Sequence, residues 1–142
     1  KWMWIDGGRA MTSTTYIGNL VEGIVLALHK GVPGEAYFIL DDGQRTMREI
    51  ITGMAQSANV QLPNRSMPGW LAEGIGGVCE FVWRSLSLKG TPPLTRHAAM
   101  VMARDCTLRG DKAARELGYV PKFSVEQGLA ELRKTFAQNQ SH

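Results

Sequence analysis

At 142 residues with 44% hydrophobic content, the chain is long enough for one modest core, so we expect a single globular unit over residues 1–142. Sixteen Lys and Arg against thirteen Asp and Glu leave a net charge of +3, and the basic residues are scattered along the sequence. This distribution excludes a nucleic-acid partner from the expected functions.

The chain contains no apolar run that approaches the roughly 20 residues needed to span a bilayer. Charged residues interrupt the longest candidate at Glu73, Glu80, Arg84 and Lys89. No stretch has the pattern of a secretory signal peptide. We therefore expect a cytoplasmic protein.

The first elements alternate between short β-prone runs and a helix. Residues 2–5 predict a strand that ends at the Asp-Gly-Gly turn of residues 6–8, and residues 14–17 predict a second strand. Asn19 then suits the N-cap of a helix that closes at Lys30 and Gly31. One face of this helix carries Leu20, Ile24 and Leu28.

A second strand–helix unit follows. Residues 36–40 form a short continuous apolar run, which is typical of a strand buried on both faces. Thr46 and Glu49 have the spacing of a capping box and predict a helix through Ala58. Between them, Asp41 and Asp42 precede a glycine, so we expect a turn there rather than acid–base chemistry.

Residues 62–93 differ in composition from the rest of the chain, because four prolines flank an apolar segment that several glycines interrupt. We expect an irregular or loosely helical, lid-like excursion. Three interpretations of its aromatic residues stay open: a lid over an apolar substrate, part of the core, or an amphipathic segment at a membrane interface. We favour lid or core over membrane contact.

The last third is predicted to be mostly helical. Residues 95–103 favour a helix, residues 106–108 a brief strand, and Asp111 a cap for a short helix that Gly118 ends. Ser124 and Gln127 form a second capping box, which opens a final helix. That helix carries Leu129, Leu132 and Phe136 along one side.

A search for catalytic and ligand motifs finds little. Gly74, Gly76 and Gly77 lack the spacing of a pyrophosphate-binding turn, and no phosphate-binding loop or serine nucleophile elbow is present. Cysteines 79 and 106 stand far apart and predict reduced, buried thiols, and the three histidines are too dispersed for a local metal motif. We expect no metal site and no catalytic residue.

The ordered set of segments resembles the C-terminal half of extended short-chain dehydrogenases/reductases, the group of sugar-nucleotide epimerases and 3β-hydroxysteroid dehydrogenases. The resemblance covers nearly the whole chain. It begins with Tyr-Ile-Gly-Asn at residues 16–19, which leans toward the 3β-hydroxysteroid branch, and continues through residues 34–39 and 46–49. It ends with residues 92–96, the Leu-Gly-Tyr-Val-Pro sequence of residues 117–121, and residues 124–129.

The resemblance implies an α/β fold, or more strictly an α+β portion: the C-terminal part of an extended Rossmann-type dehydrogenase, with a few short strands and several helices, lacking the dinucleotide-binding half. In that family a Tyr-x-x-x-Lys pair moves the proton while a nicotinamide carries hydride. Tyr16, Tyr37 and Tyr119 are not followed by Lys at that spacing, and the family places the pair upstream of the matched region. We therefore expect no cofactor bound by this chain alone and no activity by itself; NAD or NADP is implied for the parent enzyme.

In the family this portion sets substrate choice. The resemblance implies that Thr12, Ser13 and Tyr16 face a small-molecule substrate, although ordinary strand propensity also explains Thr and Tyr there. Asn19 is either a helix cap or a ligand contact. Trp70 and Arg84, in the lid-like excursion, complete the candidate substrate-binding residues.

Two functions are compatible with the sequence. The leading one is the substrate-binding portion of an NAD(P)-dependent oxidoreductase or epimerase that acts on a hydroxyl-bearing carbon of a sterol-like, terpenoid or sugar-derived substrate. The alternative is a cofactor-free binding or assembly module derived from such an enzyme. The partner expected for the first is the Rossmann half of the parent, and the apolar surface left without it also predicts a homo-oligomer.

Overall fold

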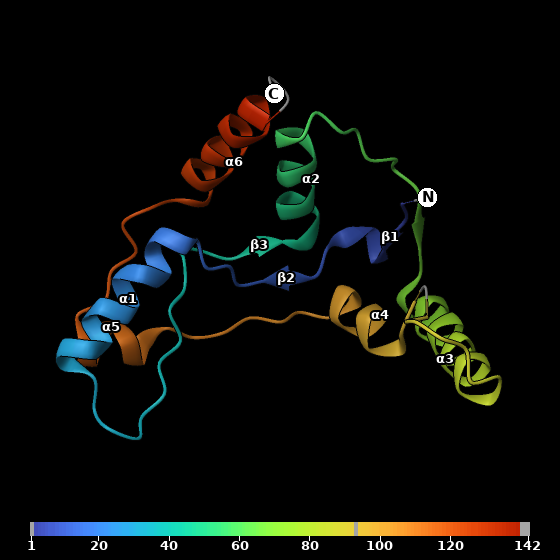
Figure 1. The fold of residues 1–142 in the computed structure, drawn as a ribbon, viewed down its shortest axis with the longest axis horizontal. Coiled ribbons are helices and arrows are strands. Elements are labelled where there is room, and N and C mark those ends of the chain that lie inside the picture. The colour runs from blue at the N-terminus through green and yellow to red at the C-terminus, as the bar shows by residue number, and fades with distance from the viewer. Residues whose placement is uncertain (1, 93, 140–142) are drawn as a thin grey trace.

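The computed structural model describes residues 2–92 and 94–139, and its helices form three pairs around short central strands (Figure 1). Helix α1 packs on α5, α2 on α6, and α3 on α4. The helices are α1 Ile17–Lys30, α2 Met47–Ser57, α3 Gly69–Ser85, α4 Arg96–Ala103, α5 Asp111–Leu117 and α6 Val125–Asn139. The strands are β1 Trp4–Ile5, β2 Met11–Thr12, β3 Arg45–Thr46 and β4 Ser66–Met67, and a 3-10 turn, η1, covers Asp6–Gly8.

The strands form two separate two-stranded ladders. Strand β1 runs parallel to β4 with Trp4 opposite Ser66, and β2 runs antiparallel to β3 with Met11 opposite Thr46. The brief strand expected at residues 106–108 is reduced to one bridge between Cys106 and Thr12. The ladders connect the three helix pairs (Figure 1), and the mixture of helices with short strands confirms the α/β class.

Capping chemistry was predicted accurately where the pattern was local. Thr46 accepts a hydrogen bond from the backbone N–H of Glu49 while the Glu49 carboxylate accepts from Thr46, so the capping box of α2 is confirmed. Ser124 and Gln127 make the same reciprocal pair before α6. Gly118 ends α5 with a φ of 69°, the left-handed conformation that glycine adopts at low cost.

Two caps were predicted wrongly. Helix α1 ends at Lys30 as expected, but its N-cap is Tyr16, and Asn19 lies in the first turn of the helix. The strand expected at residues 14–17 is absent, because these residues lead into α1 and pair with no other strand. Helix α5 likewise takes Gly110 as its N-cap, with Asp111 as its first residue.

Residues 62–93 are more regular than expected. Helix α3 extends for 17 residues despite three glycines between positions 74 and 77, so this part of the segment is a regular helix where an irregular or loosely helical excursion was expected. The helix survives because Gly76 fits against the backbone of Thr95 and Arg96, where an added Cβ would lie 2.7 Å from the Arg96 nitrogen. Close packing on α4 therefore compensates for the helix cost of glycine.

Residues 36–40 are not a strand in the described chain, contrary to the prediction. They run beside α1 (Figure 1), with Ile39 against Gly23, but no strand pairs with them. Phe38 is 57% exposed. An apolar β-prone segment without a pairing strand cannot form a ladder, and this explains the loss of the predicted element.

The described residues contain two small hydrophobic clusters where one core was expected. Ile5, Ala72 and Ala99 centre the first, between β1, α3 and α4. Ala113, Leu117 and Tyr119 centre the second, between α1 and α5. Burial of the thiols was also predicted wrongly, since both are free but Cys79 is half-buried and Cys106 exposed.

Helix α1 is apolar around most of its circumference. One side packs on α5, while the opposite side exposes Ile17, Val21, Ile24, Val25 and Leu28. A helix that is hydrophobic on all sides is normally buried on all sides. The exposed side of α1 therefore has the composition of a contact surface. None of the described helices is long and apolar enough to cross a membrane.

Candidate functional site

Four of the six predicted substrate-binding residues come together around the segment that joins β2 to α1. This segment, residues 12–16, lies beside residues 39–42, and the backbone N–H of Asp41 donates to the Thr14 carbonyl at 2.9 Å. Thr12, Ser13 and Tyr16 belong to the segment and Asn19 follows it by one helical turn. The other two predicted residues, Trp70 and Arg84, lie apart on α3.

The Asp41 carboxylate organises this segment. It is 9% exposed and accepts the backbone N–H of Tyr16 at 2.8 and 2.9 Å, the Thr14 hydroxyl at 2.8 Å and the Asn19 amide at 2.7 Å. The turn expected here is present, but Asp41 fixes the start of α1 as well. Sequence reasoning missed this role, because the partners of Asp41 lie 22 to 27 residues away along the chain.

Asn19 is fully buried and its amide is fully engaged. Its nitrogen donates to Asp41 and to the Phe123 carbonyl, and its oxygen accepts the backbone N–H groups of Lys122 and Phe123. An Asn side chain offers two donors and one acceptor oxygen with two lone pairs. All of them are used inside the protein, so these contacts support positioning of α1 and give no support to ligand contact.

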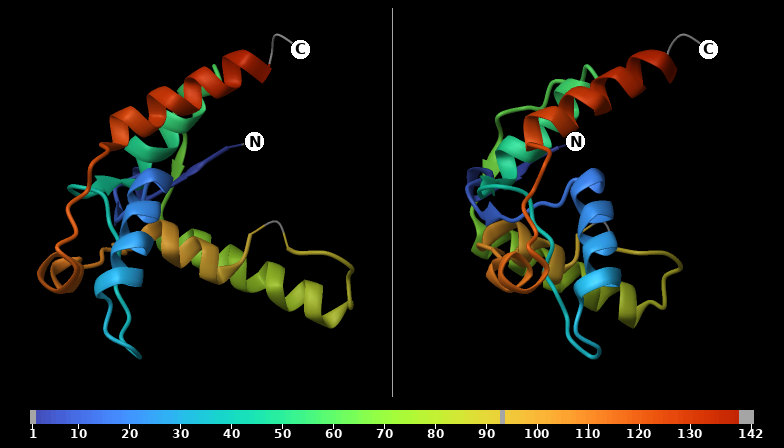
Figure 2. Two further views of the ribbon diagram at one scale, coloured as in Figure 1. Left: turned by 60° about the vertical axis from the view of Figure 1, so that its left-hand side comes forward. Right: turned by 90° about the vertical axis from the view of Figure 1, so that its left-hand side faces the viewer.

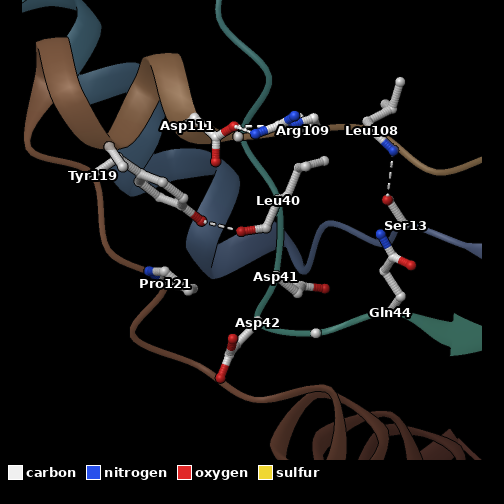
Figure 3. Close-up of a pocket in the computed structure, with 13 residues that line it drawn as sticks. Ser13, Leu40, Asp41, Asp42, Gln44, Leu108, Arg109, Asp111, Tyr119 and Pro121 are labelled. Carbon is white, nitrogen blue, oxygen red and sulfur yellow. Dashed lines mark hydrogen bonds and ion pairs between the residues drawn. The ribbon is translucent and has the colours of Figure 1, made fainter.

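A cavity of about 400 Å³, lined by both polar and apolar residues, opens beside Ser13 and Asp41 (Figure 3). Ser13 stands at one end, where its hydroxyl accepts the Leu108 N–H at 2.9 Å. Asp42 and Gln44 line another part, and Arg109 lies near α5, paired with Asp111 at 2.7 Å. The Ser13 hydroxyl keeps its own proton free to donate, so this cavity offers hydrogen-bonding groups of both kinds.

A smaller, mainly apolar cavity of about 240 Å³ opens beside residues 14–16. Thr14, Thr15 and Tyr16 line it together with Asp41. Its remaining lining comes from α1, α2 and α6: Ile17, Ile50, Met54, Val125, Gly128, Leu129 and Leu132. Residues 13–16 therefore border a cavity of mixed lining at Ser13 and an apolar cavity at residues 14–16, and Asp41 lines both. Such a pair of cavities suits a ligand with both polar and apolar surface.

Tyr16 lines the apolar cavity and is held on several sides. Its ring lies 5.5 Å from that of Phe123, and an added Cβ at Gly128 would approach the ring to 2.7 Å. Its hydroxyl donates to the Glu131 carboxylate on α6, and this hydrogen bond raises the pKa of Tyr16. A phenol in this setting stays protonated at neutral pH and does not supply a base.

Tyr119 joins α5 to the segment beside α1. It is 5% exposed, and its hydroxyl donates to the Leu40 carbonyl at 2.9 Å (Figure 3). Burial, with a smaller effect of the Asp41 charge, raises the pKa of Tyr119 to about 12. The folded protein therefore holds this proton more tightly than the unfolded chain does.

This difference predicts an alkaline loss of stability. The contribution of Tyr119 is complete below the ordinary tyrosine pKa of about 10 and is lost as pH rises toward 12. We expect Tyr119→Phe, which removes the bond to Leu40, to cost about 1 kcal/mol at neutral pH. Urea unfolding of both proteins at neutral and alkaline pH checks this. An equal alkaline loss in both would contradict the assignment.

Trp70 and Arg84 lie on α3, on the far side of α4 from the segment (Figure 1). Trp70 is 75% exposed. Arg84 borders a separate cavity of about 390 Å³ between α3 and the residues Leu88, Gly90, Pro92 and Thr95. The structure therefore does not bring these two residues to the cavities beside residues 12–16.

The described residues do not fit a nicotinamide dinucleotide site. Such a site needs a glycine-rich turn between a parallel strand and a helix N-terminus. Gly74, Gly76 and Gly77 instead lie inside α3, where their backbone groups serve the helix. Across residues 2–92 and 94–139 there is also no group of three His, Cys, Asp or Glu side chains placed to hold a metal ion. His142 lies outside the described residues.

The chain combines an α/β fold of helices and short strands with two cavities beside residues 12–16. No family model matches the chain. It is 34% identical over 134 residues to the 4-hydroxy-2-methyl-3-oxo-4-farnesyl-3,4-dihydroquinoline-1-oxide ketoreductase of Stigmatella aurantiaca, covering 94% of this chain and 40% of that protein. It is 29% identical to the decarboxylating sterol-4-alpha-carboxylate 3-dehydrogenase of Dictyostelium discoideum, covering 93% of this chain and 41% of the relative.

Solved structures agree on the fold. The dTDP-glucose 4,6-dehydratase of Bacillus anthracis, crystallised with NAD, superposes with a TM-score of 0.60 at 18% identity over 99% of this chain and 36% of that protein. The chain thus spans about 40% of the length of the relatives it matches. It corresponds to the C-terminal portion of an extended short-chain dehydrogenase/reductase, in the group of NAD-dependent epimerases/dehydratases and 3β-hydroxysteroid dehydrogenases.

Proposed function

We propose that this chain is the substrate-binding portion of an NAD(P)-dependent oxidoreductase that acts on an oxo- or hydroxyl-bearing carbon of an apolar, terpenoid- or sterol-like substrate. The observation that carries the proposal is that residues 13–16 border both a cavity of mixed polar and apolar lining and a mainly apolar cavity. The sequence relatives support the apolar substrate, since one is named for a farnesyl-bearing compound and another for a sterol. The support for a sugar-derived substrate comes only from solved structures of lower sequence identity, so we favour such a substrate less.

Within this proposal the site residues have different roles. Ser13, whose hydroxyl accepts from Leu108 and can also donate into the larger cavity, is the candidate for hydrogen bonding to a substrate oxygen, and Thr12 neighbours it. Tyr16 and Asn19 position the segment through their hydrogen bonds to Glu131, to Asp41 and to residues 122–123. None of these residues is proposed to transfer a proton or hydride.

The nicotinamide and the acid–base pair belong, in this proposal, to a cofactor-binding portion that covers α1. The exposed apolar side of α1 and the unpaired residues 36–40 are the surfaces that support such a partner. Pairing of residues 36–40 with a strand of that portion would give them the ladder they lack here. Where this partner is absent, the same surfaces favour self-association of the chain.

A chimera tests the proposed function. This chain would replace the matching 134-residue region of the Stigmatella aurantiaca ketoreductase, leaving the rest of that enzyme intact. We expect the chimera to oxidise NADH or NADPH with an apolar oxo substrate, and Ser13→Ala in the chimera to raise KM several-fold, while Ser85→Ala, on α3, leaves it unchanged. A chimera that folds and binds NADH but turns over no such substrate would favour the cofactor-free binding module.

A further inference from the structure

Helix α3 lies at the edge of the molecule, with α4 as the helix that packs along it (Figure 1). The α3–α4 pair extends away from α2 and α6 in both views of Figure 2. The outer side of α3 exposes large apolar side chains: Trp70 is 75% exposed, Phe81 71% and Val78 64%. Leu71 and Ile75 continue this surface, which we call the outer face of α3.

The acidic groups of α3 lie on its other side. The Glu73 carboxylate pairs with Arg104 at 3.2 Å, and the Glu80 carboxylate accepts the backbone N–H of Arg96 at 3.0 Å. Both partners lie in or at the end of α4, so both carboxylates face that helix. Successive residues turn by about 100° around a helix, which places the outer face away from Glu73 and Glu80. The outer face is therefore apolar and free of acidic groups.

The net positive charge of the chain lies in the segment that contains this helix, because that segment has few acidic residues. Residues 62–104 contain five Lys or Arg and two Glu, so the whole net charge of +3 resides in this segment, and the rest of the chain is balanced. Arg84 and Lys89 are exposed at the C-terminal end of α3 and just beyond it, next to the exposed Leu86 and Leu88. An apolar helix face with basic residues at its edge complements an anionic lipid surface.

A second copy of the chain fits this face less well. Self-association through the outer face would bring two segments of net charge +3 together, and like charges at an interface oppose binding. A membrane-spanning arrangement does not fit either, since none of the described helices is long and apolar enough. A helix of 17 residues, about 25 Å long, can lie along a surface instead.

We propose that the outer face of α3 binds the surface of an anionic lipid bilayer, with α3 parallel to the membrane plane. Trp70 and Phe81 enter the interface between headgroups and acyl chains, and Arg84 and Lys89 contact anionic headgroups. This inference stands on the exposure and charge of residues 62–104 and does not depend on the proposed reductase function.

Vesicle sedimentation tests the proposal. The chain would be mixed with phosphatidylcholine vesicles with or without phosphatidylserine, at low and high salt. We expect partitioning at least about tenfold stronger onto the anionic vesicles, weakened by salt. No sedimentation with anionic vesicles, or equal binding to both compositions, would overturn the proposal.

Paired variants distinguish membrane binding through the outer face of α3 from nonspecific binding through other exposed apolar residues. Trp70→Ser with Phe81→Ser should weaken partitioning by about tenfold or more, because two large apolar side chains no longer enter the interface. Leu28→Ser with Phe38→Ser changes two exposed apolar residues elsewhere and should leave it unchanged. Equal losses in both pairs would overturn the assignment to α3.

The charge contribution is tested in the same assay. Arg84→Glu with Lys89→Glu should lower partitioning onto anionic vesicles by more than about fivefold per residue. The control is Arg133→Glu with Lys134→Glu, which makes the same charge change on α6 and should have a smaller effect. Sedimentation velocity of the chain with and without Val78→Arg tests the alternative that a second copy of the chain covers the outer face. If the chain does not bind vesicles, and forms a dimer that Val78→Arg converts to monomer, the outer face is a dimer interface and the proposal is overturned.

Discussion

Asp41→Ala is expected to lower the free energy of unfolding by about 3 kcal/mol, one of the two largest effects we predict for a single substitution. The change removes the acceptor for the Tyr16 N–H, the Thr14 hydroxyl and the Asn19 amide. The Asn19 amide is fully buried, so it cannot turn to water for a replacement. Urea unfolding followed by circular dichroism measures the effect.

The neighbouring carboxylate supplies the control. Asp42 is exposed, and Asp42→Ala should leave the urea midpoint close to that of the unmodified chain. Asp41→Asn should fall between the two, because an amide oxygen can still accept from Tyr16 and Asn19 while its nitrogen donates to the Thr14 hydroxyl. Similar midpoints for Asp41→Ala and Asp42→Ala would show that Asp41 does not organise the segment.

The second large effect is expected at Trp4, whose replacement by Ala should cost about 4 kcal/mol. Trp4 is 1% exposed and its indole N–H donates to the Pro63 carbonyl at 3.0 Å. The Arg48 guanidinium lies 5.1 Å from its ring. Truncation removes the packing between β1 and the end of α2 and leaves a cavity that the backbone cannot close.

Trp70 provides a matched control of the same residue type. Because Trp70 is 75% exposed, Trp70→Ala should change the unfolding free energy by less than about 0.5 kcal/mol. Urea titration followed by circular dichroism avoids dependence on the tryptophan that is removed. If Trp4→Ala unfolds at the same urea concentration as Trp70→Ala, the packing described around β1 is wrong.

Local signals in the sequence predicted local structure well. The Thr46–Glu49 and Ser124–Gln127 pairs specify their helix starts because each capping box closes within four residues. The left-handed Gly118 is equally local. Asn19 misled the prediction, because its side chain binds Asp41 and residues 122–123 and does not cap the helix it precedes in the pattern.

The remaining errors have a common physical cause, namely contacts distant in sequence. Residues 36–40 have the composition of a buried strand but no pairing partner in the described chain. The glycines of α3 predicted irregularity, yet Gly76 permits close packing on α4. The candidate site depended on both kinds of information: the family resemblance located residues 12–16, whereas the two cavities and the role of Asp41 required coordinates.

The central claim is that this chain provides the substrate side of an oxidoreductase while its cofactor is held elsewhere. A titration of the purified chain with NADH and NADPH, followed by nicotinamide fluorescence and calorimetry, tests it most directly. We predict no saturable binding of either nucleotide, because the glycines that could contact a pyrophosphate lie inside α3. Saturable binding at micromolar concentrations would mean that the chain builds its own nucleotide site, and would contradict the account.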